Sequence, residues 1–257
     1  MRALLLFAMF LLVYLSGNII LQRASLEYSP VILNTILFSS TTFLLVFLFR
    51  KYADEKSIVS LGFPFSARNA IMGSWSAIVV LGLVITIFKI TSVSSFDHFS
   101  WPGINWYAGL LIMLVVGISE ETLFRGYLLN NLMQSFDKWR ALGFSAMMFA
   151  FMHIGNPNIT AIAALNILLA GGVLGCNYIF TKNLWFGILF HFTWNFLLGP
   201  VLGYNVSGVG ISSLMAPELR GSEVFTGGAF GPEGSVIVTV LLSALLVVIP
   251  MLYRPRN

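Results

Sequence analysis

Long runs of apolar residues, separated by short polar segments, cover most of the chain. A helix that spans a membrane needs about 20 mostly apolar residues. By this rule the sequence predicts eight helices, over residues 3–21, 31–49, 70–88, 104–124, 141–154, 159–180, 183–202 and 235–253. The fifth is short, and Gly155-Asn156-Pro157 is expected to tilt or break it. Helices of uneven length suit a protein that encloses a polar cavity, since irregular backbone at membrane depth needs such shelter.

The composition agrees with a membrane protein. Hydrophobic residues make up 58% of the 257 residues and charged residues only 9%, whereas roughly a quarter of residues in a soluble domain are charged. No polar stretch is long enough to fold separately, so we predict an all-α, polytopic integral membrane protein with one membrane domain over residues 1–257. Arg2 and the apolar residues after it resemble a signal peptide, but no cleavage site of small residues is evident and the run continues to Leu21. A retained first span is therefore expected.

The composition also argues against several classes of partner. Cys176 is the single cysteine, so neither a disulfide framework nor a cysteine-based metal cluster is predicted. The net charge is +4, but no basic patch is interleaved with aromatic residues. Nucleic-acid binding is therefore not predicted, and the expected partner is the lipid bilayer. The sequence carries no information on the oligomeric state.

Lysine and arginine are distributed unevenly between the two predicted sides of the membrane. Cytoplasmic loops of membrane proteins carry an excess of these residues. With the N-terminus inside, the cytoplasmic side collects 11 of the 14: Arg2, Arg50, Lys51, Lys56, Arg68, Arg125, Lys138, Arg140, Lys182, Arg254 and Arg256. The outside keeps Arg23, Lys89 and Arg220. The predicted orientation therefore has both termini in the cytoplasm.

The segments outside the candidate site carry little predicted chemistry. Residues 203–234 form a Gly- and Ser-rich external loop, which is flexible by composition and contains no motif. His98, beside Asp97, is expected in a solvated outer loop. Gly171 and Gly175, four residues apart in the sixth helix, should let a neighbouring helix approach closely.

Two adjacent carboxylates, Glu120 and Glu121, lie where a membrane helix should carry no charge. Intramembrane ionisable residues are functional candidates, because each costs free energy unless it is paired or hydrated. Residues four apart share a helix face, so Glu121 is expected to pair with Arg125. Glu120 then faces elsewhere and is free to accept or give a proton. The structural alternative is a helix-end pair that reaches cytoplasmic water, with Arg125 as its anchor.

Two of the three histidines lie inside predicted helices. His153 lies four residues after Phe149 in the fifth helix, and His191 lies four residues before Asn195 in the seventh. With a rise of about 1.5 Å per residue, His191 lies roughly 12 Å and His153 roughly 18 Å from the cytoplasmic ends of their helices. Because Glu120 lies near the cytoplasmic end of its helix, these groups are expected to meet in one cavity that opens to the cytoplasm. The structural alternative is that the histidines and Asn195 serve only helix packing.

Two histidines, a carboxylate and an amide in one cavity suit the hydrolysis of an amide bond. A glutamate activates water as general base, with a histidine positioning that water or sharing its proton. Imidazole and carboxamide donors stabilise the oxyanion of a tetrahedral intermediate. In a second mechanism, Glu120, His153 and His191 bind zinc, which lowers the pKa of its bound water. The spacing does not separate the metal-independent mechanism from the zinc mechanism.

Three short motifs follow one another on separate apolar helices: Glu120-Glu121-x-x-x-Arg125, Phe149-x-x-x-His153 and His191-x-x-x-Asn195. In this order they resemble the CPBP (Abi) family, which contains type II CAAX prenyl endopeptidases and bacteriocin-processing or self-immunity proteins. The resemblance covers residues 104–202. It implies that Glu120 is the catalytic glutamate and works with His153. It also implies that His191 and Asn195 are oxyanion donors or, if a metal is used, contribute to its site.

The remaining motif residues are implied to support the site. Glu121 would be held by Arg125, and Phe149 would form part of the cavity wall. The resemblance further implies a protease of the bacterial cytoplasmic membrane, with its active site toward the cytoplasm. Its substrate would be a membrane-associated peptide or protein, prenylated or bacteriocin-like, that is cleaved near the C-terminus.

Two hypotheses from other classes stay open at this point. A proton-coupled transporter would use Glu120 and the histidines as a proton relay, although the sequence shows no internal repeat of the kind common in transporters. A non-catalytic immunity or interaction protein of the same fold would keep its function when Glu120 is replaced. The motifs His-Glu-x-x-His, Gly-x-Ser-Gly and Gly-x-Gly-Asp are absent from the sequence, which disfavours the zinc site-2, rhomboid and aspartyl classes of intramembrane protease.

Overall fold

The computed structural model describes residues 1–23 and 30–253. Its α-helices are α1 (Arg2–Arg23), α2 (Pro30–Leu48), α3 (Ala67–Ile90), α4 (Ile104–Glu121), α5 (Asn130–Leu132), α6 (Lys138–Met152), α7 (Ala161–Thr181), α8 (Trp185–Phe196), α9 (Glu223–Thr226) and α10 (Val236–Met251). Short 3-10 or π-helical segments are η1 (Phe49–Ala53), η2 (Ile58–Leu61), η3 (Thr122–Leu129), η4 (Leu197–Val201), η5 (Gly228–Phe230) and η6 (Pro232–Gly234). The strands are β1 (Ser94–Phe99) and β2 (Met215–Leu219).

A helix is present at each of the eight predicted positions, and the fold is mostly helical as predicted. Within the described residues, five stretches are long and apolar enough to cross a membrane: Arg2–Leu21, Val31–Ala53, Ala67–Ile90, Ile104–Leu132 and Ala161–Thr181. α10 is apolar but shorter. α6 ends at Met152, so the predicted break before Gly155 is confirmed. The long apolar helices identify an integral membrane protein.

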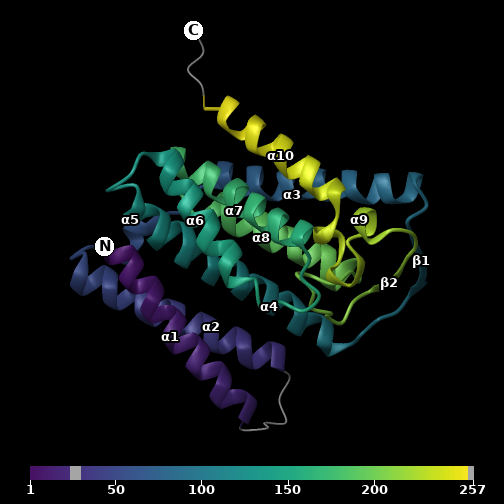
Figure 1. The fold of residues 1–257 in the computed structure, drawn as a ribbon, viewed down its shortest axis with the longest axis horizontal. Helices are drawn as coiled ribbons and strands as arrows, with labels where there is room; N and C mark the ends of the chain where they lie inside the picture. Colours follow the sequence, from purple (N-terminus) through teal and green to yellow (C-terminus); the bar gives the residue numbers. More distant parts are fainter. Residues whose placement is uncertain (24–29, 254–257) are drawn as a thin grey trace.

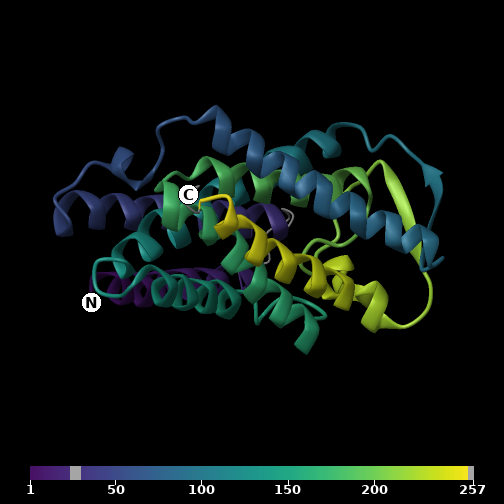
Figure 2. The same ribbon diagram turned by 90° about the horizontal axis from the view of Figure 1, so that it is seen from above.

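The helices are arranged around α7 and α8 (Figure 1). α3 packs on α8 and α10 packs on α7, while α4 joins α8 to the α1–α2 hairpin. The hairpin lies at the lower edge of the bundle in Figure 1 and behind the other helices in Figure 2. Of the candidate spans, α7 has the largest buried share, 61%, and α1 the smallest, 17%. α7 therefore belongs to the core, and α1 belongs to the periphery.

One end of the bundle collects charged side chains from several helices. Arg50 pairs with Asp54 at 3.1 Å, and Arg2 reaches the same carboxylate at 3.2 Å. These contacts join the start of α1 to the region after α2, two segments that the sequence assigns to the cytoplasm. Arg254 and Arg256, which the sequence assigns to the same side, lie outside the described residues.

Arg125 does not belong to this charged end. Only 1% of its side chain is exposed, and it lies inside the continuous helical stretch Ile104–Leu132. The prediction that the fourth helix ends at residue 124, with Arg125 on the cytoplasmic side, was therefore wrong. The helix continues because Arg125 finds internal partners, so its charge does not need water.

The opposite end of the bundle is covered by β1, β2 and the segment 203–234. β1 and β2 pair antiparallel, with Ser94 opposite Leu219, and lie far from the N-terminus in Figure 1. The segment that the sequence predicts to be a flexible loop contains β2, α9, η5 and η6. Its glycines serve as turn residues: Gly227 and Gly231 have φ of 83° and 98°, a conformation that glycine adopts without strain. His98 belongs to β1 and not to a loop.

α6 and α7 pack closely, as the glycine spacing predicts. A Cβ atom at Gly171 would lie 3.0 Å from Cα of Ala146, and one at Gly175 would lie 2.6 Å from the side chain of Leu142. Small residues thus allow the two backbones to approach. This close contact also leaves the carbonyl of Gly171 within reach of Arg125.

Candidate active site

Glu121 and Arg125 form a buried ion pair, as their spacing predicts. Nη1 of Arg125 donates to Oε1 of Glu121 at 2.7 Å, and Nη2 donates to the carbonyl of Gly171 at 3.0 Å. The guanidinium carbon lies 4.5 Å from the ring centre of Phe149. The Glu121 side chain has no exposed surface. The pair is therefore an internal brace between α4, η3 and α7.

His191 on α8 is held by the same carboxylate. Its Nδ1–H donates to Oε1 of Glu121 at 3.2 Å, which leaves Nε2 directed toward Glu120. One turn earlier on α8, Gly187 provides the space for Glu121: a Cβ atom there would lie 2.3 Å from Oε2 of Glu121. The contact between α4 and α8 thus sets the position of both the carboxylate and the imidazole.

Replacing Gly187 with alanine is expected to displace Glu121 and lower stability by about 1–3 kcal/mol, the usual cost of overpacking. Alanine is otherwise the better helix former, so a loss of stability is informative. Gly82→Ala in α3 is the matched control, because a Cβ atom at Gly82 meets nothing within 4 Å. Thermal unfolding in detergent measures both variants. Equal stability of the two variants would contradict the proposed packing.

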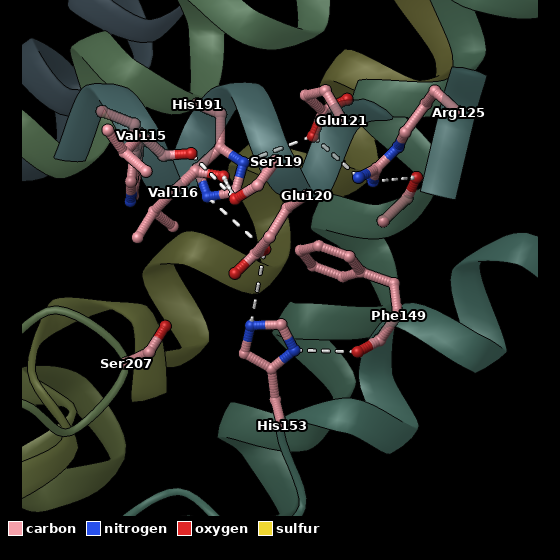
Figure 3. A network of polar contacts seen from close by, with 12 residues as sticks. Val115, Val116, Ser119, Glu120, Glu121, Arg125, Phe149, His153, His191 and Ser207 are labelled. Atoms are coloured by element: carbon pink, nitrogen blue, oxygen red, sulfur yellow. Dashed lines mark hydrogen bonds and ion pairs between the residues drawn. The ribbon is translucent and has the colours of Figure 1, made fainter. Parts of the chain in front are cut away.

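Glu120 lies between His153, directly after α6, and His191 on α8 (Figure 3). Its Oε2 is 3.9 Å from Nε2 of His153 and 3.9 Å from Nε2 of His191. Nδ1–H of His153 donates to the carbonyl of Phe149 at 2.8 Å, so this ring also turns Nε2 toward Glu120. The Glu120 side chain is 13% exposed. The structure thus brings together Glu120, His153 and His191 from α4, the end of α6 and α8.

Two cavities meet at these residues. The larger, about 250 Å³, contains Glu120 in its wall, and the smaller, about 50 Å³, contains Phe149. Both cavities share the side chains of His153, His191, Asn195 and Ser207. Asn195, predicted as a site residue, therefore faces the same space as the histidines.

The larger cavity lies toward the end of the bundle that carries β1 and β2. Its walls include Val31 at the start of α2, Ile112 in the first half of α4, and Ile211 in the segment 203–234. The sequence predicts that the cavity opens at the lysine- and arginine-rich end, whereas these lining residues belong to the end that carries β1 and β2.

Glu233 is a cavity residue that sequence reasoning missed. Its Oε1 accepts a hydrogen bond from Nε1 of Trp194 at 2.9 Å, and its Oε2 accepts from the N–H of Ser207 at 2.5 Å. Asn166 donates to its backbone carbonyl at 2.7 Å. Burial raises the pKa of Glu233 above its ordinary value, although the Ser207 and Trp194 donors and His153 lower it. Acidic residues are rare in this chain, and this was the one indication in the sequence that Glu233 has a role. Glu233 belongs to none of the three motifs.

A zinc site made by Glu120, His153 and His191 does not fit this geometry. Ligand atoms around a tetrahedral zinc lie about 3.3 Å apart when the bonds are about 2.0–2.1 Å long. The Glu120 carboxylate is 3.9 Å from each imidazole nitrogen. Within residues 1–23 and 30–253, no group of three or more His, Cys, Asp or Glu side chains is placed to hold a metal ion. The geometry therefore favours a mechanism carried by protein groups.

Long apolar helices that enclose a glutamate, two histidines and an asparagine are typical of an intramembrane hydrolase. Residues 101–197 match the family model of the type II CAAX prenyl endopeptidase Rce1-like proteins. The match contains all three motifs, covers less than half of the chain, and confirms the resemblance predicted from the motifs. Because these proteins are proteases, the match supports a membrane endopeptidase. No curated protein matches the chain.

Proposed function

We propose that the protein is an intramembrane endopeptidase that hydrolyses a peptide bond near the C-terminus of a membrane-anchored, prenylated or bacteriocin-like peptide. The observation that carries the proposal is the carboxylate of Glu120, placed between two imidazole rings in the wall of a cavity of about 250 Å³. The match to prenyl endopeptidases supports the same reaction class.

Glu120 acts as the general base in this mechanism. It removes a proton from water while the water oxygen attacks the carbonyl carbon of the scissile bond, which gives a tetrahedral intermediate. When the intermediate collapses, the C–N bond breaks and the proton passes from Glu120 to the leaving amine. His153 orients the water through Nε2, because its Nδ1–H is already bound to the carbonyl of Phe149.

His191 and Asn195 stabilise the oxyanion. His191 donates from Nε2 in this scheme, with its ring held in place by the Glu121 carboxylate, 3.2 Å from Nδ1. Asn195 lies one turn further along α8, and its amide is a second donor toward the same space. Donors fixed before the reaction stabilise developing charge without reorganising during it. Glu121 and Arg125 do not touch substrate in this scheme and act as positioning residues.

The walls of the larger cavity favour an uncharged peptide segment. No lysine or arginine from the described part of the chain lines it, and most of its walls are apolar. Asn34, Thr35 and Asn156 add polar groups, which suit the backbone of an extended peptide. The substrate proposed here therefore presents apolar side chains and a neutral backbone to Glu120.

The proposal is tested with purified protein in detergent and a library of lipid-anchored peptides. Mass spectrometry of the products is expected to show a new C-terminus at one defined bond. Proton-coupled transport is tested in parallel, as uptake into proteoliposomes under a pH gradient. Uptake without any peptide cleavage would contradict the endopeptidase proposal.

Removal of metal ions is expected to leave peptide cleavage unchanged, because the protein groups alone carry the proposed mechanism. The measurement compares the cleavage rate before and after dialysis against EDTA, with the metal content of the protein determined in both samples. A rate that is lost on dialysis and restored by zinc would support the zinc mechanism and overturn the metal-independent one.

A further inference from the structure

We propose that the active-site cavity opens on the non-cytoplasmic side of the membrane, and that the substrate is an exported peptide anchored in the outer leaflet. The side of opening follows from the structure and from the charge distribution. The substrate class rests, in addition, on the proposed endopeptidase function.

The walls of the larger cavity come mainly from one half of the bundle, with Phe124 of η3 among the remaining lining residues. Val31 lies at the start of α2, close to the segment that joins α1 to α2. Ile112 and Val116 lie between the start of α4 and Glu120, on the side of β1. Val209 and Ile211 belong to the segment 203–234. Apart from Phe124, these residues lie between Glu120 and the end of the bundle that carries β1 and β2.

The other half of the bundle is closed beneath Glu120. Every residue of η3, Thr122–Leu129, is buried. The ring of Phe124 packs edge-on against Phe7 at 6.4 Å and Phe149 at 5.1 Å, and Tyr127 packs against Phe49 at 6.1 Å. Protein interiors packed in this way leave few voids larger than a water molecule. A peptide therefore reaches Glu120 from the β1–β2 end and not through η3.

The positively charged end of the bundle is the closed one. The sequence assigns 11 lysines and arginines to the cytoplasmic side. Arg125 is buried inside the bundle and is left out of this count, so ten remain. The end that carries the cavity keeps three: Arg23, Lys89 and Arg220. Because lysine and arginine are retained on the cytoplasmic side during insertion, the closed end faces the cytoplasm and the cavity faces outward.

This orientation favours one of the substrate classes proposed above, an exported peptide, over a prenylated cytoplasmic protein. A cytoplasmic protein with a prenyl group in the inner leaflet meets the closed end formed by η3. A peptide that has crossed the membrane and remains anchored in the outer leaflet meets the cavity. Its mainly apolar walls, which carry no lysine or arginine from the described residues, suit a peptide segment that lies close to the lipid.

The side of opening is tested by thiol labelling, which does not depend on activity. In a Cys176→Ala background, single variants Val116→Cys and Val209→Cys probe the cavity, while Val224→Cys and Lys56→Cys probe the two ends. Leu128→Cys, in packed η3, is the buried control. Intact cells receive a small, membrane-impermeant cationic methanethiosulfonate. We expect modification at Val224 and at both cavity positions, and at Lys56 only after permeabilisation.

The opposite labelling pattern would overturn the proposal. If Lys56→Cys reacts in intact cells while Val224→Cys and the cavity variants are protected, the cavity faces the cytoplasm. Size-exclusion chromatography in detergent shows which variants are folded, and two cavity positions keep the test decisive if one variant misfolds.

The substrate class is tested with a lipid-anchored peptide that the enzyme cleaves in detergent. Added to the outside of sealed vesicles, the peptide is expected to be cleaved by right-side-out vesicles and left intact by inside-out vesicles. Cleavage only by inside-out vesicles would overturn the exported-peptide proposal. If no peptide is cleaved in detergent, the endopeptidase function itself fails, while the thiol labelling still decides the side of opening.

Discussion

Replacing Glu120 with glutamine is expected to reduce the rate of peptide cleavage by about 10²–10⁴-fold, the usual contribution of a general base. Glutamine preserves the size of the side chain and its position between His153 and His191, but it does not accept a proton from water. The measurement is the single-turnover rate of cleavage of a lipid-anchored peptide in detergent. Substrate affinity should change little, because the variant removes proton transfer and leaves the cavity walls intact.

The matched control for this variant is Glu223→Gln, which removes an exposed carboxylate from α9. It is expected to cleave at the wild-type rate. Thermal unfolding of both variants separates a loss of chemistry from a loss of fold. Wild-type cleavage by the Glu120 variant would refute the general-base role of Glu120.

Replacing Arg125 with methionine is expected to lower the free energy of unfolding by about 3–5 kcal/mol, the cost of breaking a buried ion pair on one side only. The variant leaves the carboxyl group of Glu121 fully buried and hydrogen-bonded only to His191. Unfolding in mixtures of mild detergent and dodecyl sulfate measures the loss. Cleavage should fall as well, because Arg125 no longer fixes the position of the Glu121 carboxylate that orients His191.

Two comparison variants separate charge from packing in this prediction. The double variant Glu121→Gln/Arg125→Met removes both charges and should recover most of the lost stability, since an uncharged pair of similar volume carries no desolvation penalty. Arg140→Met breaks an exposed ion pair with Asp137, whose side chains are 79% and 52% exposed, and should cost less than about 1 kcal/mol. Equal losses in the free energy of unfolding for Arg125→Met and Arg140→Met would contradict a stabilising role of the buried ion pair between Glu121 and Arg125.

Local features of the sequence were sufficient to predict the positions of the helices and the ion pair between Glu121 and Arg125. Each apolar run is long enough to fix a helix by itself, so a helix appears at every predicted position. The pairing of Glu121 with Arg125 follows from four-residue spacing on one helix and needs no knowledge of neighbouring helices. The close approach of α6 to α7 likewise follows from Gly171 and Gly175, because small residues leave room for any partner helix.

The sequence pattern was least informative for segments whose structure depends on contacts with residues far away in the sequence. The segment 203–234 reads as flexible because glycine and serine are typical of linkers. In the structure its glycines form turns, and Glu233 ties the segment to Trp194 and Ser207. The end of the fourth helix was misplaced for the same reason, since the internal partners of Arg125 include the carbonyl of Gly171 on α7.

The sequence by itself determined the class of fold, the three motifs and the identity of the polar residues, because each depends on composition or on spacing within one helix. Only the tertiary structure decided how Glu120 meets His153 and His191, why Gly187 is required beside Glu121, and which residues line the cavity. These depend on contacts between segments far apart in the chain, such as the hydrogen bond between Glu121 and His191 across 70 residues. Spacing along one helix gives no information about such contacts, because the packing of its neighbours determines them.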